Sequence, residues 1–317
     1  MGKKLDEVIG VLNGTIGDHL ARTGNGLGIA MGLYHDGQPL AIEPDAIRAA
    51  HPDAGARAAL LVHGIMCTES VWQFPDGSDY GTMLQRDLGI TPLYVRYNSG
   101  LSIPDNGASL ARLLESLAGA WPAPLEEIIL IGFSMGGLLV RSACHTAHRE
   151  KLAWLGMVRR ALYVGTPHRG APTERAGRVL ARVLRAIPEP VTRLIADIGD
   201  LRSDGIKDLG DADVRHEDRA RRRDTISLRD PRHPVPLLDG MEHHLIAGSL
   251  SQSKWLTMLF GDAIVPVSSA TDGRHGEAQA GGMPSGDVRL IPGVAHLGLA
   301  HHPEVYAQIR AWCEETK

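Results

Sequence analysis

The sequence predicts an α/β protein with a mostly parallel central sheet, helices on both faces of that sheet and a helical insertion. Two observations predict this fold class. Short, continuously apolar or β-branched runs alternate with segments of helical periodicity. These runs end in Gly, Asn or Ser, as buried parallel strands do. Because ligands bind at the carboxyl ends of strands in such folds, the residues after each strand are the first candidates for a functional site.

The composition fits one globular core. The chain has 317 residues, 43% of them hydrophobic and 22% charged, with a formal net charge of -4, which gives no general attraction to nucleic acid. No apolar run approaches the ~18 residues of a membrane span, and Asp6 and Glu7 interrupt any signal-peptide core. Three cysteines without C-x-x-C spacing indicate reduced thiols. We therefore expect a soluble, cytoplasmic protein of undetermined oligomeric state.

An amphipathic helix and a hairpin are predicted before the first parallel strand. Apolar residues recur at spacings of three and four from Leu5 to Leu20, which predicts a helix that ends near Arg22. Its apolar face could contact a second subunit or a membrane surface, but packing on its own domain is the commoner fate. Asp36 and Gly37, between two apolar runs, are typical of a hairpin turn. We expect this hairpin to open the sheet.

Parallel strands and helices then alternate along the chain. A helix is predicted over 109–121, where apolar residues at helical spacing follow the capping candidates Asp105 and Asn106 and precede Pro122. Another helix should follow the third parallel strand, and a last one should close the chain. The predicted parallel strands are residues 57–64, 91–98, 126–132, 160–165, 244–250 and 288–293.

The segment 171–239 is predicted to be a helical lid or cap insertion in a core made of residues 1–170 and 240–317. It has few strand-like runs and many arginines. The arginine run at 221–223 is typical of a solvated helix face, with phosphate or carboxylate binding as the alternative. Apolar residues at helical spacing between 180 and 198 could cover an acyl pocket or could pack in a core.

One serine lies between glycines directly after the most apolar strand. Residues 132–136 read Gly-Phe-Ser-Met-Gly, and G-x-S-x-G between a strand and a helix predicts a nucleophile elbow at Ser134. The glycines are needed because the serine sits in a strained backbone conformation on a sharp turn. A free serine hydroxyl is a poor nucleophile, so it requires a base, an acid and an anion site. The alternative role of Ser134 is to cap the following helix.

Backbone N–H groups for an oxyanion are predicted in two loops. Met135, the residue after the nucleophile, supplies one amide, and Ile65, in the loop after the first parallel strand, supplies the second. His63 in the same loop is predicted to orient the loop rather than to act as the base, and it stays a candidate for contact with substrate.

The order of residues along the chain selects an acid and a base among many candidates. In folds that carry this serine turn, the acid and then the base follow the nucleophile. Asp262 lies after the penultimate strand and His296 lies just after the last strand, so we predict Asp262 as the acid and His296 as the base. The alternative for Asp262 is a turn residue, since Gly-Asp is a common turn pair.

Six stretches together carry a family resemblance. They are VHGIM (62–66), residues 80–115, IGFSMGGLLVRSA (131–143), GTPHRGAP (165–172), GDAIVPVSSA (261–270) and PGVAHLGL (292–299). These stretches resemble the bacterial lipase-like serine esterases related to GPI-inositol deacylases, over nearly the whole chain. The resemblance implies an α/β-hydrolase fold with a lid between the sixth and seventh strands. It also carries Ser134, Asp262 and His296 over as a catalytic triad, but it does not fix the substrate.

Two further side chains near the predicted site have competing interpretations. His168 could contact substrate, although the residues around it mainly shape a turn. Cys67 could be a reactive thiol, yet nothing near it in the sequence would activate the thiolate. No metal-binding motif is present in the sequence, so we expect neither a catalytic metal nor a cofactor; scattered aspartates leave a structural calcium open.

These residues predict a carboxylic-ester hydrolase that acts on a small-molecule or lipid-like ester through an acyl-enzyme. Two alternatives stay open at this point. The first is an acyltransferase or thioesterase with the same triad, and the second is a binding protein that keeps the fold without catalysis. A preference for short soluble esters over a true lipase activity is favoured because the chain shows no export signal.

Overall fold

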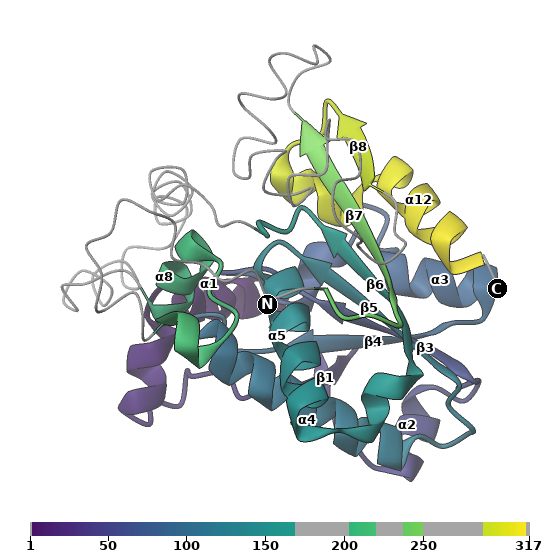
Figure 1. The fold of residues 1–317 in the computed structure, drawn as a ribbon, viewed down its shortest axis with the longest axis horizontal. Coiled ribbons are helices and arrows are strands. Elements are labelled where there is room, and N and C mark those ends of the chain that lie inside the picture. Colours follow the sequence, from purple (N-terminus) through teal and green to yellow (C-terminus); the bar gives the residue numbers. More distant parts are fainter. Residues whose placement is uncertain (1, 169–202, 220–236, 250–287, 315–317) are drawn as a thin grey trace.

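The computed structural model describes residues 2–168, 203–219, 237–249 and 288–314 (Figure 1). Within these residues an eight-stranded sheet in the order β2-β1-β4-β3-β5-β6-β7-β8 forms the centre of the molecule. The strands are β1 (Gly32–His35), β2 (Gln38–Leu40), β3 (Arg57–Val62), β4 (Thr91–Arg96), β5 (Glu127–Phe133), β6 (Val158–Val164), β7 (Glu242–Ser249) and β8 (Val288–Pro292).

The sheet is parallel except at one edge, as the sequence predicts. Strand β1 pairs antiparallel with both β2 and β4, and every pairing from β4 through β8 is parallel. The predicted hairpin at Asp36 and Gly37 is confirmed, and it lies at this edge of the sheet. Both turn residues have a positive φ, 48° and 73°, which the tight two-residue hairpin turn requires.

Helices flank the sheet and join its strands. They are α1 (Gly2–Arg22), α2 (Pro44–Ala50), α3 (Tyr80–Leu88), α4 (Ile103–Ala120), α5 (Met135–Glu150), α8 (Asp204–Asp211) and α12 (Pro303–Glu314), with the short 3₁₀ helices η1 (Glu69–Trp72), η2 (Ala153–Met157) and η3 (His296–His301). Among the helices that the structure describes, none combines the length and the hydrophobicity that crossing a bilayer requires.

Two hydrophobic cores lie on opposite faces of the sheet. Successive residues of a strand point to opposite faces, so Leu60 and Val62 of β3 join one core and Ala59 and Leu61 join the other. Helices α4 and α5 cover the first face, and α3 and α12 cover the second face (Figure 1). A strand that is buried on both sides must be apolar at every position, which explains the continuous apolar runs in the sequence.

Helix α4 begins earlier than the sequence predicts. The prediction of a helix start at 109, capped by Asp105 or Asn106, is wrong, because the helix starts at Ile103 and its N-cap is Ser102. The Ser102 Oγ accepts the N–H of Asp105 at 3.1 Å. Asn106 instead uses its side-chain amide to donate to the carbonyl of Asn98 at 2.9 Å. The extra helical turn packs next to the loop that follows β4.

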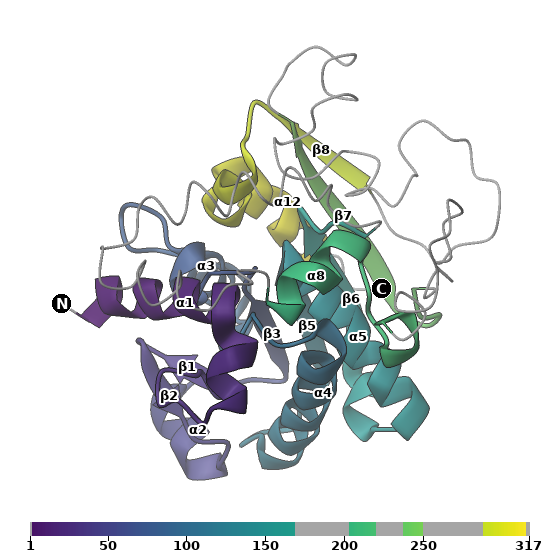
Figure 2. The ribbon, with the colours of Figure 1, turned by 90° about the vertical axis from the view of Figure 1, so that its left-hand side faces the viewer.

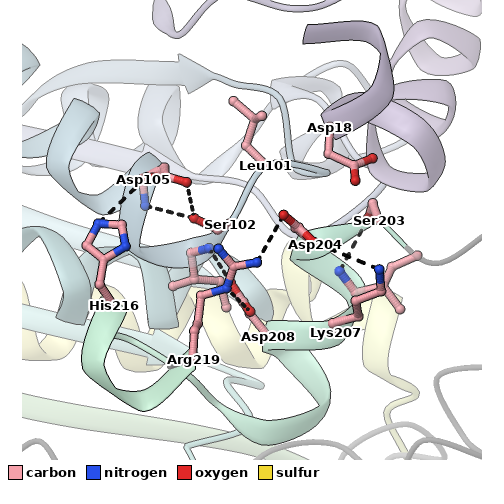
Figure 3. A network of polar contacts seen from close by, with 12 residues as sticks. Asp18, Leu101, Ser102, Asp105, Ser203, Asp204, Lys207, Asp208, His216 and Arg219 are labelled. Atoms are coloured by element: carbon pink, nitrogen blue, oxygen red, sulfur yellow. Dashed lines mark hydrogen bonds and ion pairs between the residues drawn. The ribbon is translucent and has the colours of Figure 1, made fainter. Parts of the chain in front are cut away.

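The described part of the predicted insertion is held against the core by α8 (Figure 3). Asp208 of α8 is fully buried, and its carboxylate accepts the N–H of Ile103 at 2.9 Å, at the start of α4. A carboxylate is favoured there because the N-terminus of a helix carries partial positive charge. Arg219 pairs with Asp208 and Asp204, each at 2.9 Å. The domain boundary at 171–239 stays a prediction, since most of that segment lies outside the described residues.

Helix α1 lies beside α8 and against the loops that follow β3 and β4 (Figure 2). The predicted helix that ends near Arg22 is confirmed. Leu12, Ile16 and Leu20 are buried against the protein's own core, which is the expected fate of the apolar face. The helix bends at Ile16, where φ is -132° and ψ is 19°.

Candidate active site

Ser134 occupies a sharp turn between β5 and α5. Its backbone has φ 53° and ψ -123°, and a positive φ in a residue with a side chain is strained. The turn is held because the N–H of Ser134 donates to the carbonyl of Val164 at 2.8 Å. Although Ser134 is the N-cap of α5, its side chain makes no capping hydrogen bond within the described chain. The hydroxyl is thus not used to cap the helix.

The glycines on either side of Ser134 are required by close backbone packing. A Cβ at Gly132 would lie 2.5 Å from the Cα of Gly137, and a Cβ at Gly136 would lie 2.5 Å from the carbonyl oxygen of His63. Real Cβ atoms do not approach backbone atoms this closely. The spacing G-x-S-x-G therefore reflects two tight contacts: Gly132 lies against the start of α5, and Gly136 lies against the carboxyl end of β3.

The loop after β3 lies directly beside Ser134. A Cβ at Gly64 would lie 3.1 Å from the Cβ of Ser134, so the loop touches the serine side chain. The N–H of Met66 donates to the Oγ of Ser99 at 3.0 Å, and the N–H of Cys67 donates to the carbonyl of Gly64 at 3.4 Å. Among the described residues, none accepts a hydrogen bond from the N–H of Ile65.

The other predicted oxyanion donor, Met135, lies at the start of α5. Met135 is the first residue of this helix, and the first N–H groups of a helix have no partner within it. These N–H groups also lie at the positive end of the helix dipole, which favours a nearby anion. The two amides predicted from the sequence thus belong to the loop after β3 (Ile65) and to the first turn of α5 (Met135), which meet at Ser134.

His296 is buried next to the serine turn. It is the first residue of η3 and only 4% exposed. Its ring lies 5.1 Å from the ring of Phe133, the residue before Ser134. A Cβ at Gly165 would lie 3.1 Å from the His296 Cε1, and Gly165 follows Val164, whose carbonyl accepts the N–H of Ser134. Folding therefore brings residue 296 to the same strand ends as residue 134.

The predicted acid lies outside the described residues. Asp262 falls in the segment 250–287, so its role beside His296 stays a prediction. The arginine run at 221–223 and the apolar residues between 180 and 198 lie outside the described residues as well.

Both ring nitrogens of His63 are used by the backbone. Its Nδ1 donates to the carbonyl of Gly64 at 2.8 Å, and its Nε2 accepts the N–H of Tyr97 at 3.3 Å. The ring is fully buried and stacks on Tyr97 with 4.3 Å between the ring centroids. Burial lowers the pKa of His63 to about 4, because a charged ring loses its hydration. This neutral ring fixes the loop that contains Ile65.

His168 and Cys67 lie near the site without the features of reacting groups. The Arg141 guanidinium donates to the Nδ1 of His168 at 3.0 Å, and this ring packs edge-on against Tyr163 at 4.9 Å. Contact of His168 with substrate stays a prediction. Burial raises the pKa of the Cys67 thiol to about 12, so the thiolate that a nucleophile requires is disfavoured.

Ser99 is a residue of this region that the sequence reasoning did not select. It lies after β4 in the loop Asn98–Leu101 and is 1% exposed. The signal that could have found it is its position, since small polar residues at the carboxyl end of a parallel strand line the functional edge of the sheet.

Within the described chain, no group of three or more His, Cys, Asp and Glu side chains is arranged to hold a metal ion.

Comparison with solved structures gives distant likenesses. The mature lipase BlEst2 of Bacillus licheniformis is 17% identical, with a TM-score of 0.49, over 81% of this chain and 91% of that one. The RedJ thioesterase of Streptomyces coelicolor is 16% identical, with a TM-score of 0.46, over 86% and 94% of the two chains. A thermophilic esterase of Thermogutta terrifontis is 16% identical, with a TM-score of 0.44, over 90% and 92%. No curated protein sequence matches the chain.

The family is given by a sequence model rather than by these structures. Residues 59–309 match the model of the alpha/beta hydrolase family. This match spans β3 through most of α12, and it includes the serine turn, the loop after β3 and His296. Since the match covers well over half of the sequence and the sheet has the arrangement described above, the protein belongs to the α/β-hydrolase family.

Proposed function

We propose that this protein hydrolyses carboxylic esters through a covalent acyl-enzyme on Ser134. One observation carries the proposal: Ser134 is held at a positive φ of 53° with its side chain not engaged in capping α5, and buried His296 lies against the adjacent strand ends. A strained serine is stable only where the surrounding structure enforces it, and such strain is concentrated at functional sites. A purely structural serine gains nothing from this conformation.

The proposed reaction begins with proton transfer. His296 takes the proton of the Ser134 hydroxyl while the Oγ attacks the carbonyl carbon of the ester, and Asp262 orients and stabilises the imidazolium. The electron pair of the carbonyl moves to oxygen, which the N–H groups of Ile65 and Met135 stabilise. When the tetrahedral intermediate collapses, the ester C–O bond breaks and His296 gives its proton to the leaving alcohol.

Water then completes the cycle. His296 removes a proton from water, the hydroxide attacks the acyl carbon, and the acid leaves as the proton returns to Ser134. The two backbone amides supply the largest share of the rate gain, since each oxyanion donor contributes about 3 kcal/mol to the transition state.

The proposed substrate is a small-molecule or lipid-like ester, with short soluble esters preferred. The finer resemblance to lipase-like esterases related to GPI-inositol deacylases supports an ester substrate but not a particular one. A cytoplasmic location, absence of nucleic acid among its partners and a function without cofactor belong to the same proposal.

Hydrolysis of p-nitrophenyl esters of graded chain length tests the reaction. Ser134→Ala should lower kcat by roughly 10⁴-fold or more, as removal of a triad member does in other serine hydrolases. Ser109→Ala, an exposed serine on α4, serves as the matched control and should keep wild-type rates. Undiminished hydrolysis by Ser134→Ala would refute the proposal, and the chain-length profile separates an esterase from a lipase.

The acyl acceptor and the leaving group distinguish ester hydrolysis from acyl transfer and from thioester hydrolysis. An acyltransferase and a thioesterase would use the same acyl-enzyme, with an alcohol in place of water or a thiol as the leaving group. Adding a primary alcohol should leave the free acid as the main product. Predominant transfer to the alcohol, or a strong preference for thioesters, would replace the ester hydrolase with one of these alternatives.

A further inference from the structure

In the loop after β3, the residue that follows the proposed oxyanion donor Ile65 has an unusual backbone conformation. Met66 has a φ of 60°, a left-handed conformation that residues with side chains rarely adopt. This φ sets the peptide group between Ile65 and Met66. The N–H of Ile65 lies on the preceding peptide group, between Gly64 and Ile65, so the conformation of Met66 reaches it through the backbone of Ile65. Something outside the loop must hold Met66 if the N–H of Ile65 is to keep a fixed direction.

Ser99 supplies one such constraint. Its Oγ accepts the N–H of Met66 at 3.0 Å, and the side chain is 1% exposed. The bond joins the loop after β3 to the loop after β4, which are neighbouring parallel strands. It also consumes the amide next to that of Ile65, so Met66 cannot compete for the oxyanion.

Helix α1 supplies the second constraint. A Cβ at Gly14 would lie 2.7 Å from the N and 2.8 Å from the Cα of Met66, so the helix rests directly on the backbone of the loop. The bent helix is itself fixed, because the carbonyl of Gly14 accepts from the Oγ of Ser203 at 2.7 Å and the carbonyl of Gly17 accepts from the Nδ2 of Asn98 at 2.8 Å. Helix α1, fixed by these two hydrogen bonds, thus packs directly on the loop at Met66.

We propose that Ser99 and Gly14 are positioning residues that hold Met66 left-handed and thereby aim the N–H of Ile65 at the reacting carbonyl oxygen. The inference rests on the proposed function and deepens it: the segment before β1 is part of the catalytic apparatus, although it supplies no reacting group. Oxyanion stabilisation depends on donors fixed before the reaction begins, so a loosened loop loses rate rather than substrate affinity.

A pair of serine variants isolates this role. Ser99 and Ser102 are three residues apart, each is 1% exposed, and each accepts one backbone N–H, from Met66 at 3.0 Å and from Asp105 at 3.1 Å. Ser99→Ala and Ser102→Ala should therefore lower Tm to a similar extent. Only Ser99→Ala should lower kcat for a p-nitrophenyl ester, by roughly tenfold to a hundredfold with KM nearly unchanged.

The inhibition constant of a transition-state analogue does not depend on the folding stability of the variant. A trifluoromethyl ketone forms a tetrahedral adduct with the serine whose oxygen binds the same amides, so its affinity follows stabilisation of the transition state rather than of the substrate. The inhibition constant should rise in Ser99→Ala by the same factor by which kcat falls. It should stay at the wild-type value in Ser102→Ala.

A glycine pair tests the helix. Gly14→Ala should lower kcat and raise the inhibition constant of the ketone. The added Cβ would meet backbone atoms of the loop, which cannot rotate away as a side chain can. Gly119→Ala on α4, where a Cβ meets nothing within 4 Å, should behave as wild type. If Gly14→Ala does not fold, the serine pair decides alone.

The two failures are distinguishable. If wild-type protein hydrolyses esters and Ser99→Ala matches Ser102→Ala in kcat and in ketone affinity, the positioning role is wrong and the proposed function stands. A higher KM with an unchanged kcat in Ser99→Ala would also overturn the positioning role. If the wild type hydrolyses no ester and binds no ketone, the proposed function fails and this inference fails with it.

Discussion

The His63 ring is an example of a histidine that takes part in structure near a candidate active site. With one nitrogen donating to Gly64 and the other accepting from Tyr97, only the neutral ring satisfies both bonds. Protonation would place a second donor against the N–H of Tyr97 in a fully buried site. Burial, which removes the hydration of a charged ring, lowers the pKa of His63 to about 4.

The lowered pKa of His63 predicts acid sensitivity. A histidine whose folded pKa lies below its unfolded value near 6.5 stabilises the fold fully above pH 6.5, and this contribution is lost as the pH falls toward 4. The loss is on the order of 3 kcal/mol. Urea unfolding of wild type and His63→Gln between pH 4 and pH 7 measures it, and the variant should have the shallower slope. Equal slopes would show that His63 does not titrate in this way.

Gly136 tests the packing of the serine turn. Gly136→Ala should destabilise the protein by about 2 kcal/mol or more, because its Cβ would meet the carbonyl oxygen of His63 at 2.5 Å. Gly156→Ala, where a Cβ meets nothing within 4 Å, is the control and should change stability little. A Gly136→Ala protein with wild-type stability would mean that the turn and β3 are not in the contact described.

The sequence predicts the role of some residues of the site but not of others. Ser134 could be predicted because G-x-S-x-G needs only local backbone geometry, and the close contacts at Gly132 and Gly136 explain why those two positions cannot vary freely. For Ser99 the sequence offers only its position after a predicted parallel strand, while its role depends on a hydrogen bond to a residue 33 positions away. A single sequence does not reveal such a partner.

Helix α4 shows how an element can be recognised while its start is missed. Its apolar spacing from Leu110 onward predicts the helix correctly. The first five residues of the helix include Pro104, Asn106 and Gly107, residue types that usually indicate a loop, so the sequence predicts a start that is too late. Proline is acceptable there because the first N–H groups of a helix have no partner to lose, and the tertiary contact with Asp208 secures the turn.

Ser102 is predicted to stabilise this helix start. Ser102→Ala should lower the free energy of unfolding by about 1 kcal/mol, the usual value of an N-cap side chain. Ser109→Ala is the control within the same helix, since its exposed hydroxyl bonds only the preceding turn, and it should change stability by less than about 0.5 kcal/mol. Urea denaturation of both variants checks this, and an equal effect of the two would remove Ser102 as the cap.

At the scale of the whole molecule, a row of charges joins the amino ends of four parallel strands. Glu127 of β5 accepts from the Arg57 Nε at 2.7 Å and pairs with the Arg160 Nη1 at 3.2 Å, and Arg160 pairs with Glu242 at 3.3 Å. Glu127 and Arg160 are each 4% exposed. The row lies at the strand ends opposite to Ser134, so its role is in the alignment of the sheet.

Removing the central carboxylate of this row should be costly. Glu127→Ala leaves the charge of Arg57 and Arg160 less compensated, and the free energy of unfolding should fall by about 3 kcal/mol or more. Glu217→Ala breaks a pair with Arg149 in which both side chains are about 60% exposed, and it should cost less than about 1 kcal/mol. Chemical denaturation compares them, and similar losses would show that the buried row does not stabilise the sheet.

The overall topology was predictable, whereas the predicted insertion at 171–239 stays a prediction because most of it lies outside the described residues. Alternating apolar runs and helical segments indicate a parallel sheet wherever strands are buried on both faces, as β3 and β5 are. Helix α8 has no such signature, because it is fixed by single contacts such as Asp208 with the start of α4. The relation of Asp262 to His296 is likewise a matter of tertiary structure, and it stays a prediction.

Covalent labelling tests the central claim most directly. A fluorophosphonate should add one label per wild-type chain, located on the peptide that contains Ser134, as measured by intact mass and peptide mass spectrometry. Ser134→Ala should not be labelled, and His296→Ala should be labelled at least roughly 100-fold more slowly, because the base is missing. Labelling of another residue, or equal rates for wild type and His296→Ala, would contradict the account.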